Sequence, residues 1–187
     1  MEKRYKIKTE PTEYPVSLDD VKRNLHIPIA DIDADRDDLL QDLIYDAVEA
    51  SQNNTGRQYC PATYTLYLDE YPDDDLVEIE KGPVISIESV KYYAEGATEM
   101  TVVDPADYQL DNAELTARLL FLETFTPDPD RLAPIEIEFT CGYAPVGNQA
   151  APVPYPLKQA VILRACGAYR NPENDAENFG MGRKIRS

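Results

Sequence analysis

Tryptophan is absent from this chain of 187 residues, and histidine occurs once, as His26. A single histidine leaves no Ser-His or Cys-His pair for conventional nucleophilic catalysis, and the catalytic motifs G-x-S-x-G and H-E-x-x-H and a glycine-rich phosphate loop are missing too. No apolar run approaches the roughly 20 residues that a membrane-spanning helix needs. These absences predict a protein that is not an enzyme, needs no cofactor and does not cross a membrane.

Cysteine is scarce as well. Cys60, Cys141 and Cys166 are odd in number and far apart, and none has a second cysteine or a histidine at the spacing of a zinc site. We therefore expect three buried free thiols and no metal. The first residues, MEKRYKIKTEP, are basic but lead into no apolar segment, so they do not resemble a secretion signal and favour a cytoplasmic site of synthesis.

Basic residues are outnumbered, with 18 Lys and Arg against 35 Asp and Glu and a net charge of -17. The imbalance is concentrated in residues 61–140, which contain 19 acidic and 4 basic side chains, whereas residues 141–187 contain 3 and 6. Affinity for duplex DNA comes largely from clustered Lys and Arg. The distribution indicates an acidic body with a basic C-terminal end and argues against a protein that grips duplex DNA, so we expect no sequence-specific binding of nucleic acid.

Three segments have helical character. Ser17, with Asp20 three residues later, has the pattern of a capping box and predicts a helix over residues 17–25. Apolar residues recurring every three or four positions predict a second helix over residues 36–54, with Gly56 suited to a left-handed end. Residues 157–169 are apolar on nearly all sides, which predicts a third helix covered from several directions, in part by another subunit.

The second predicted helix carries a row of carboxylates opposite its apolar face, at Asp35, Asp38, Asp42, Asp46 and Glu49. Like charges at this spacing repel each other by roughly 0.2 to 0.5 kcal/mol per pair, so the row does not serve to stabilise the helix. We call Asp38, Asp42, Asp46 and Glu49 the acidic stripe.

The start of this helix has part of the spacing of a calcium loop, because Asp31, Asp33, Asp35 and Asp42 fall at positions one, three, five and twelve. Arg36 stands where the loop needs glycine, and Asp42 is shorter than the usual glutamate. The pattern therefore favours acidic residues that meet the positive end of a helix over a cation site.

Alternating apolar and polar residues predict the strands, over residues 62–69, 76–80, 84–93, 118–122 and 135–141, with a bulge near Ser89. The predicted fold is α+β, with an N-terminal pair of helices and a C-terminal helix packed around a small, mainly antiparallel sheet. Residues 1–15 are expected to be an extended arm, residues 16–170 a single domain and residues 171–187 a basic tail.

Six segments together resemble the head-tail connector family, also called adaptor or head-completion proteins, of long-tailed bacteriophages. In chain order they are VSLDDVKRNLHI, DDLLQDLIYDAVEASQNNTGRQY, GPVISIESVKYY, YQLD, IEIEFTCGYAP and VPYPLKQAVILRACGAYRNPE, spanning about residues 16–173. Their order and spacing carry the resemblance, because no single one of them is a specific motif.

The resemblance implies a virion protein, made in the cytoplasm of a bacterial host, whose copies form a ring of twelve between the portal and a tail-side neck or tail-completion protein. DNA passes through such a ring. We expect portal docking by Arg170, Arg183, Lys184 and Arg186, since a basic tail can order against an acidic partner. The acidic stripe would face the channel or a subunit seam. The alternative is an acidic inhibitor that mimics DNA, its carboxylates imitating phosphates.

Overall fold

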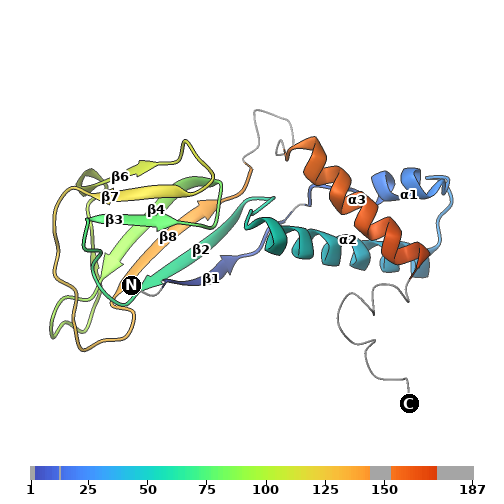
Figure 1. The fold of residues 1–187 in the computed structure, drawn as a ribbon. Coiled ribbons are helices and arrows are strands. Elements are labelled where there is room, and N and C mark those ends of the chain that lie inside the picture. Colours follow the sequence, from blue (N-terminus) through green and yellow to red (C-terminus); the bar gives the residue numbers. More distant parts are fainter. Residues whose placement is uncertain (1–2, 13, 144–152, 172–187) are drawn as a thin grey trace, which may run out of the picture. The chain divides into compact units, whose positions relative to one another are not determined.

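The computed structural model describes residues 3–12, 14–143 and 153–171. The chain forms two compact units, each of which is assembled from two separate stretches of the sequence (Figure 1). The β unit comprises Met1–Glu13 and Gly56–Pro152, and the helical unit comprises Tyr14–Thr55 and Val153–Ser187. The α+β class is confirmed. Where the sequence suggested one domain over residues 16–170, the structure has two units because the helices and the sheets bury separate sets of apolar residues.

The β unit contains two antiparallel sheets rather than the one that was expected. The larger has the order β1-β2-β8-β4-β5, formed by Lys3–Thr9, Ala62–Leu68, Ile135–Cys141, Val84–Tyr92 and Thr101–Val102. The smaller has the order β3-β7-β6, formed by Leu76–Ile79, Ala117–Phe121 and Tyr108–Asp111. A short 3-10 helix, η1 at Pro105–Asp107, leads into β6. The five predicted strands are all present, while β1, β5 and β6 were not predicted.

Strand β8 lies between β2 and β4 and supplies the centre of the core. Ile135, Ile137 and Phe139 are fully buried, whereas Glu136 and Glu138 between them remain partly exposed. This is the alternation that the sequence predicts for a strand with one covered face. Buried side chains from the smaller sheet join the same apolar cluster, so the two sheets share one core.

The N-terminal arm is extended, as expected, and pairs with β2 as the edge strand β1. The Tyr5 ring packs edge-on against Phe139, with 6.3 Å between ring centroids. On the other face of the strand, Lys8 Nζ lies 2.6 Å from a carboxylate oxygen of Glu138. The arm is thus held to the sheet by an apolar contact on one face and an ion pair on the other.

The β unit has a bulge in β4 and a close approach of two backbone segments at Gly82. The register of β4 against β8 shifts between Ile87 and Ser89, which confirms the predicted bulge. At Gly82, a Cβ atom would lie 1.8 Å from the backbone oxygen of Leu115. Only glycine allows these two segments of backbone to approach so closely.

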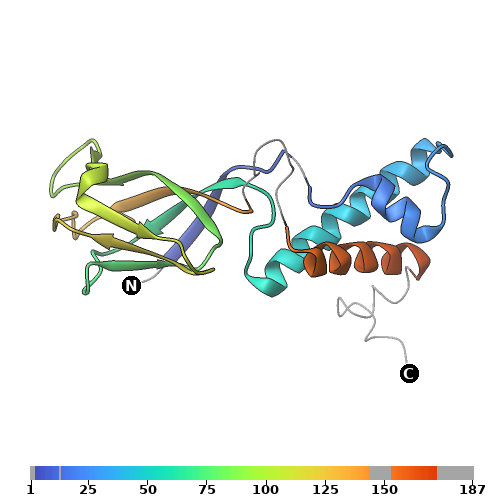
Figure 2. The ribbon, with the colours of Figure 1, turned by 90° about the horizontal axis from the view of Figure 1, so that it is seen from above.

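The helical unit consists of α1 (Leu18–Leu25), α2 (Ala34–Thr55) and α3 (Tyr155–Arg170), which lie side by side (Figure 2). The Ser17 side chain accepts from the Asp20 backbone while the Asp20 side chain accepts from the Ser17 backbone, so the predicted capping box is confirmed. Gly56 ends α2 at φ 67°, as predicted. Each helix contributes to a common core, which includes Val21, Leu40, Ile44, Val161 and Ala165. No helix among the described residues combines the length and apolar character needed to cross a membrane.

We predict that Phe139→Ala destabilises the β unit by about 3 to 5 kcal/mol, because the ring is fully buried between Tyr5 and Tyr64 and its removal leaves a cavity. Urea denaturation followed by circular dichroism measures the loss. Leu132→Ala is the control, since Leu132 is 85% exposed and should change stability little. Equal effects of the two substitutions would contradict the assigned core.

Candidate assembly surfaces

The described residues contain no group of three or more His, Cys, Asp or Glu side chains arranged to hold a metal ion. All three cysteines are free and buried, which confirms their predicted state. Burial raises the pKa of the Cys141 thiol to about 12, so this sulfur stays protonated at neutral pH and is a poor nucleophile. His26 is an exposed residue at the end of α1, in the left-handed conformation at φ 61°.

Two cations hold the acidic segment at the start of α2. Arg36 pairs with the Asp31 carboxylate at 3.0 Å, and the Arg36 backbone N–H donates to the Asp33 side chain at 3.2 Å. Lys22 of α1 is buried, and its Nζ donates to the Asp37 carboxylate at 2.6 Å. Asp33 therefore caps the first turn of α2, and Asp37 ties α2 to α1. These contacts match the acidic helix start that the sequence favoured over a calcium loop.

The acidic stripe is exposed along the outer face of α2. Asp46 lies 3.6 Å from Arg164 of α3, a partner that the spacing within α2 could not reveal. For Asp38, Asp42 and Glu49, the described part of the chain supplies no ion-pair partner. Three carboxylates of the stripe are therefore exposed on this side of the helix without an ion-pair partner among the described residues.

Helix α3 has the opposite charge. Its basic side chains are Lys158, Arg164 and Arg170, and it contains no acidic residue. Arg170 is exposed and donates to the backbone oxygen of Asn24 at 3.2 Å. The other three residues proposed for portal docking, Arg183, Lys184 and Arg186, lie outside the described residues.

A groove of about 530 Å³ lies between α1 and α3, and the sequence did not predict it. Val16 and Ile162 contribute apolar surface, and Lys158 and Arg23 contribute positive charge. Lys158 makes no ion pair with any described residue, whereas Arg23 pairs with Asp20 at 2.7 Å and keeps 63% of its side chain exposed. The groove is assembled by residues far apart in the chain, so no local motif marks it.

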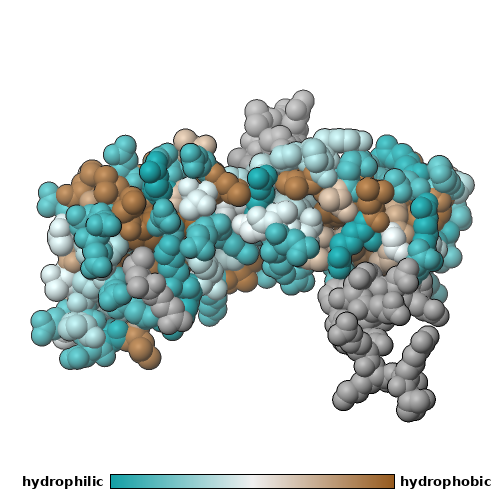
Figure 3. Space-filling view, in the orientation of Figure 1, coloured by the Kyte–Doolittle hydropathy of each residue, from teal (hydrophilic) through white to brown (hydrophobic). Residues whose placement is uncertain are grey.

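Apolar side chains also reach the surface around α3. Tyr155, at the mouth of the groove, is 72% exposed, and Leu163 is 60% exposed. Figure 3 shows brown, hydrophobic patches along this helix among hydrophilic neighbours. Exposed apolar area next to a polar rim is typical of a surface that binds another protein.

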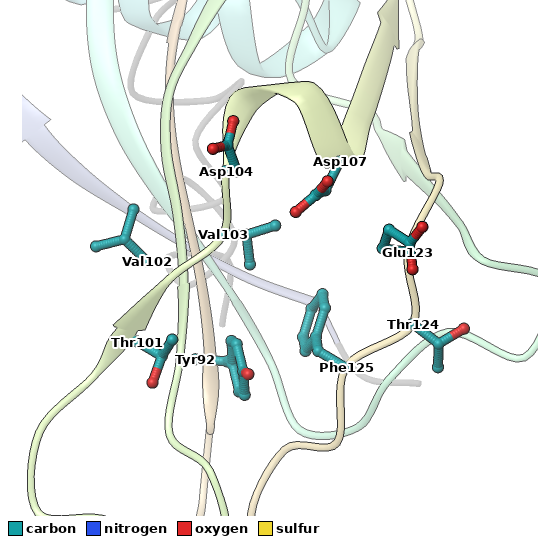
Figure 4. A pocket seen from close by; sticks show the side chains of 9 residues that line it. All are labelled: Tyr92, Thr101, Val102, Val103, Asp104, Asp107, Glu123, Thr124 and Phe125. Atoms are coloured by element: carbon teal, nitrogen blue, oxygen red, sulfur yellow. The ribbon is translucent and has the colours of Figure 1, made fainter.

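The β unit has a smaller pocket of about 300 Å³ with an acidic rim (Figure 4). Tyr92 and Phe125 line one side, with stacked rings 4.4 Å apart between centroids. The carboxylates of Asp104, Asp107 and Glu123 lie around the other side and have no ion-pair partner within the described residues. The pocket offers no basic side chain to an anion, so a phosphate group would be repelled here.

Solved structures with a similar fold come from gene transfer agent (GTA) particles. A chain in the neck of an empty GTA particle, computed with C6 symmetry, gives a TM-score of 0.73 at 21% identity, covering 89% of this chain and 84% of that chain. A chain in the virion of a native GTA particle gives 0.70 at 22% identity, with coverages of 89% and 84%. The chain has the fold of a virion neck protein.

A third structure, the neck of a native GTA particle computed with C12 symmetry, gives a TM-score of 0.67 at 20% identity, covering 89% of this chain and 83% of that chain. Neither a family model nor a curated protein matches the sequence. The fold that the connector resemblance implied is therefore confirmed by structural likeness, at 20 to 22% sequence identity.

We predict that Asp37→Asn lowers the melting temperature of the helical unit by several degrees, because it leaves the buried Lys22 ammonium without its charged partner. The hydrogen bond from Lys22 holds the pKa of Asp37 below its usual range. The contribution of Asp37 to stability is therefore complete above about pH 4 and is lost as the pH falls through the lowered folded-state pKa. Thermal melts from pH 2 to 7 measure both effects.

The matched control is Asp38→Asn, which removes the same charge from an exposed neighbouring position. It should shift the melting temperature little and leave the acid dependence unchanged. If both variants melt alike at every pH, the Lys22–Asp37 pair does not join α1 to α2 energetically.

Proposed function

We propose that this chain is a structural, non-enzymatic protein of a virion neck, whose copies form a ring between the portal and the tail through which DNA passes. The observation that carries the proposal is the likeness of the fold, over 89% of the chain, to chains of GTA necks computed with C6 and C12 symmetry. A ring of twelve copies is the number that the connector resemblance implies. The chain would be made in the bacterial cytoplasm and function in the particle.

The charge distribution supports a protein that DNA passes without binding to it. Residues 61–140 carry 19 acidic and 4 basic side chains, and the pocket of the β unit is rimmed by carboxylates. An acidic wall repels the phosphates of passing DNA and prevents it from adhering. The acidic stripe of α2 has two possible positions in such a ring, the channel wall and the seam between subunits.

The C-terminal residues are proposed to dock on the portal. Arg170 is exposed at the end of α3, and Arg183, Lys184 and Arg186 follow it in the sequence. Clustered basic side chains are complementary in charge to an acidic surface, which favours binding to it. On the other side of the ring, the partner would be a tail-side neck or tail-completion protein.

We predict that deleting residues 171–187 leaves the circular dichroism spectrum and melting temperature unchanged but abolishes association with the portal protein, measured by co-sedimentation. Reversing Arg183, Lys184 and Arg186 to Glu should have the same effect without shortening the chain. The control neutralises the acidic residues of the same segment, Glu173, Asp175 and Glu177, and should retain binding. Portal binding by the truncated chain at wild-type level would contradict this docking role.

A second candidate is an inhibitor that mimics DNA, favoured by the carboxylates that lack ion-pair partners within the described residues. Such a protein would be a monomer or dimer that binds a basic protein with steep salt dependence. Mass photometry of the chain with and without portal separates the two functions. Large assemblies of defined mass support the ring, and a monomer or dimer in both samples supports the mimic.

A further inference from the structure

Two surfaces of the helical unit differ in charge and face away from each other. All three helices contact one another, so in cross-section they occupy the corners of a triangle. The groove lies between α1 and α3, on the side opposite α2. The acidic stripe lies on the outer face of α2, opposite its buried residues Leu40 and Ile44. One side of the unit therefore presents a groove with basic side chains and the other a row of carboxylates.

This arrangement meets the geometric requirement of a closed ring. In a ring with rotational symmetry, each copy contacts its neighbours through two different patches, and the two must be complementary to each other rather than to themselves. Two identical acidic surfaces would repel, and an isologous contact through either patch alone would stop at a dimer. With a stripe on one side and a groove on the other, the stripe of each copy can contact the groove of the next, and the contacts can close around an axis.

The side chains of the two patches are complementary in charge. On the stripe, Asp42 and Glu49 are exposed and have no ion-pair partner among the residues that the structure describes. In the groove, Lys158 forms no ion pair in the described ranges, although its charge acts on the Asp20 carboxylate, and Arg23 keeps most of its side chain in solvent. Each patch therefore carries charges that the other could pair with in a second copy of the chain.

Apolar surface accompanies these charges on both patches. Leu39 is 50% exposed and Tyr45 is 41% exposed on α2, beside the stripe. Tyr155 is 72% exposed at the groove, whose walls include Ile162. An aromatic anchor beside charged pairs is the usual composition of the centre of a protein interface, because the apolar contact excludes water and the charges set the register.

We propose that the outer face of α2 in one copy docks into the α1–α3 groove of the next copy, with the carboxylates of Asp42 and Glu49 against Lys158 and Arg23. The inference rests on the proposed ring and identifies the two surfaces that meet between neighbouring subunits. It places the acidic stripe between subunits rather than on the channel wall. It also gives the exposed Tyr155 ring a position under the neighbouring helix.

Charge reversal with rescue tests the seam in the full-length chain. Asp42→Lys combined with Glu49→Lys places like charges opposite the groove and should reduce the fraction of chain in rings by about tenfold or more, as should Lys158→Glu alone. Combining Lys158→Glu with Asp42→Lys should restore much of the loss, because the pair is re-formed with reversed sign. Mass photometry and negative-stain microscopy, with and without purified portal, measure the assemblies at one fixed ionic strength.

The matched control is Glu95→Lys with Glu99→Lys, which changes the net charge equally at two exposed positions of the β unit and should leave assembly at the wild-type level. Rings formed normally by the Asp42→Lys, Glu49→Lys variant would overturn this seam while leaving the proposed function intact. Single variants that fail and are not rescued by the combination would also overturn it. A wild-type chain that forms no ring in either sample would instead contradict the proposed function itself.

Discussion

Repulsion between carboxylates constrains any contact that this chain could make with a copy of itself. The sequence has 35 acidic and 18 basic side chains, so most pairs of surfaces brought together at random would repel. The cations of the helical unit are distributed in a way that relieves this constraint. Helix α3 carries three basic residues and no acidic one, and internal pairs such as Lys22–Asp37 and Asp46–Arg164 use only part of the available charge. The acidic stripe of α2 and the basic side chains of the α1–α3 groove then lie on opposite sides of the unit.

The residues that stabilise the two units are distinct from the surfaces that we propose for assembly. The β unit is stabilised by the core around β8, and the helical unit by its own set of buried aliphatic residues. Asp42 is exposed and Lys158 is half-buried, and neither belongs to a core. The surfaces proposed for the ring can therefore change in charge without loss of the fold, which is consistent with the low identity, 21 and 22%, between this chain and chains of similar fold.

Local patterns predicted much of the fold because the signals that decide it are local. The capping box at Ser17, the left-handed Gly56 and the alternation of β8 depend on residues within one turn or one strand, and each is confirmed. The pairing of β1 was not predicted, because it depends on Tyr5 meeting Phe139, far away in the sequence. Strand β5 has only two residues, too few for an alternating pattern to be recognised.

The candidate surfaces were predictable only in part, for the same reason. The acidic stripe lies on one helix, so its spacing could be read directly from the sequence. The groove is made jointly by α1 and α3, and the contact of Asp46 with Arg164 joins two helices separated by the whole β unit in the sequence. Charge complementarity between patches therefore emerges only from the folded unit.

We propose that copies of this chain close into a ring with an open axis in the neck of a virion. Electron cryomicroscopy of the purified chain mixed with its portal decides whether such a ring forms. We expect a closed ring of this fold seated on the portal, with a continuous axial channel that accommodates duplex DNA. Particles in which the portal carries no added ring, with the chain present only as monomers or dimers, would contradict it.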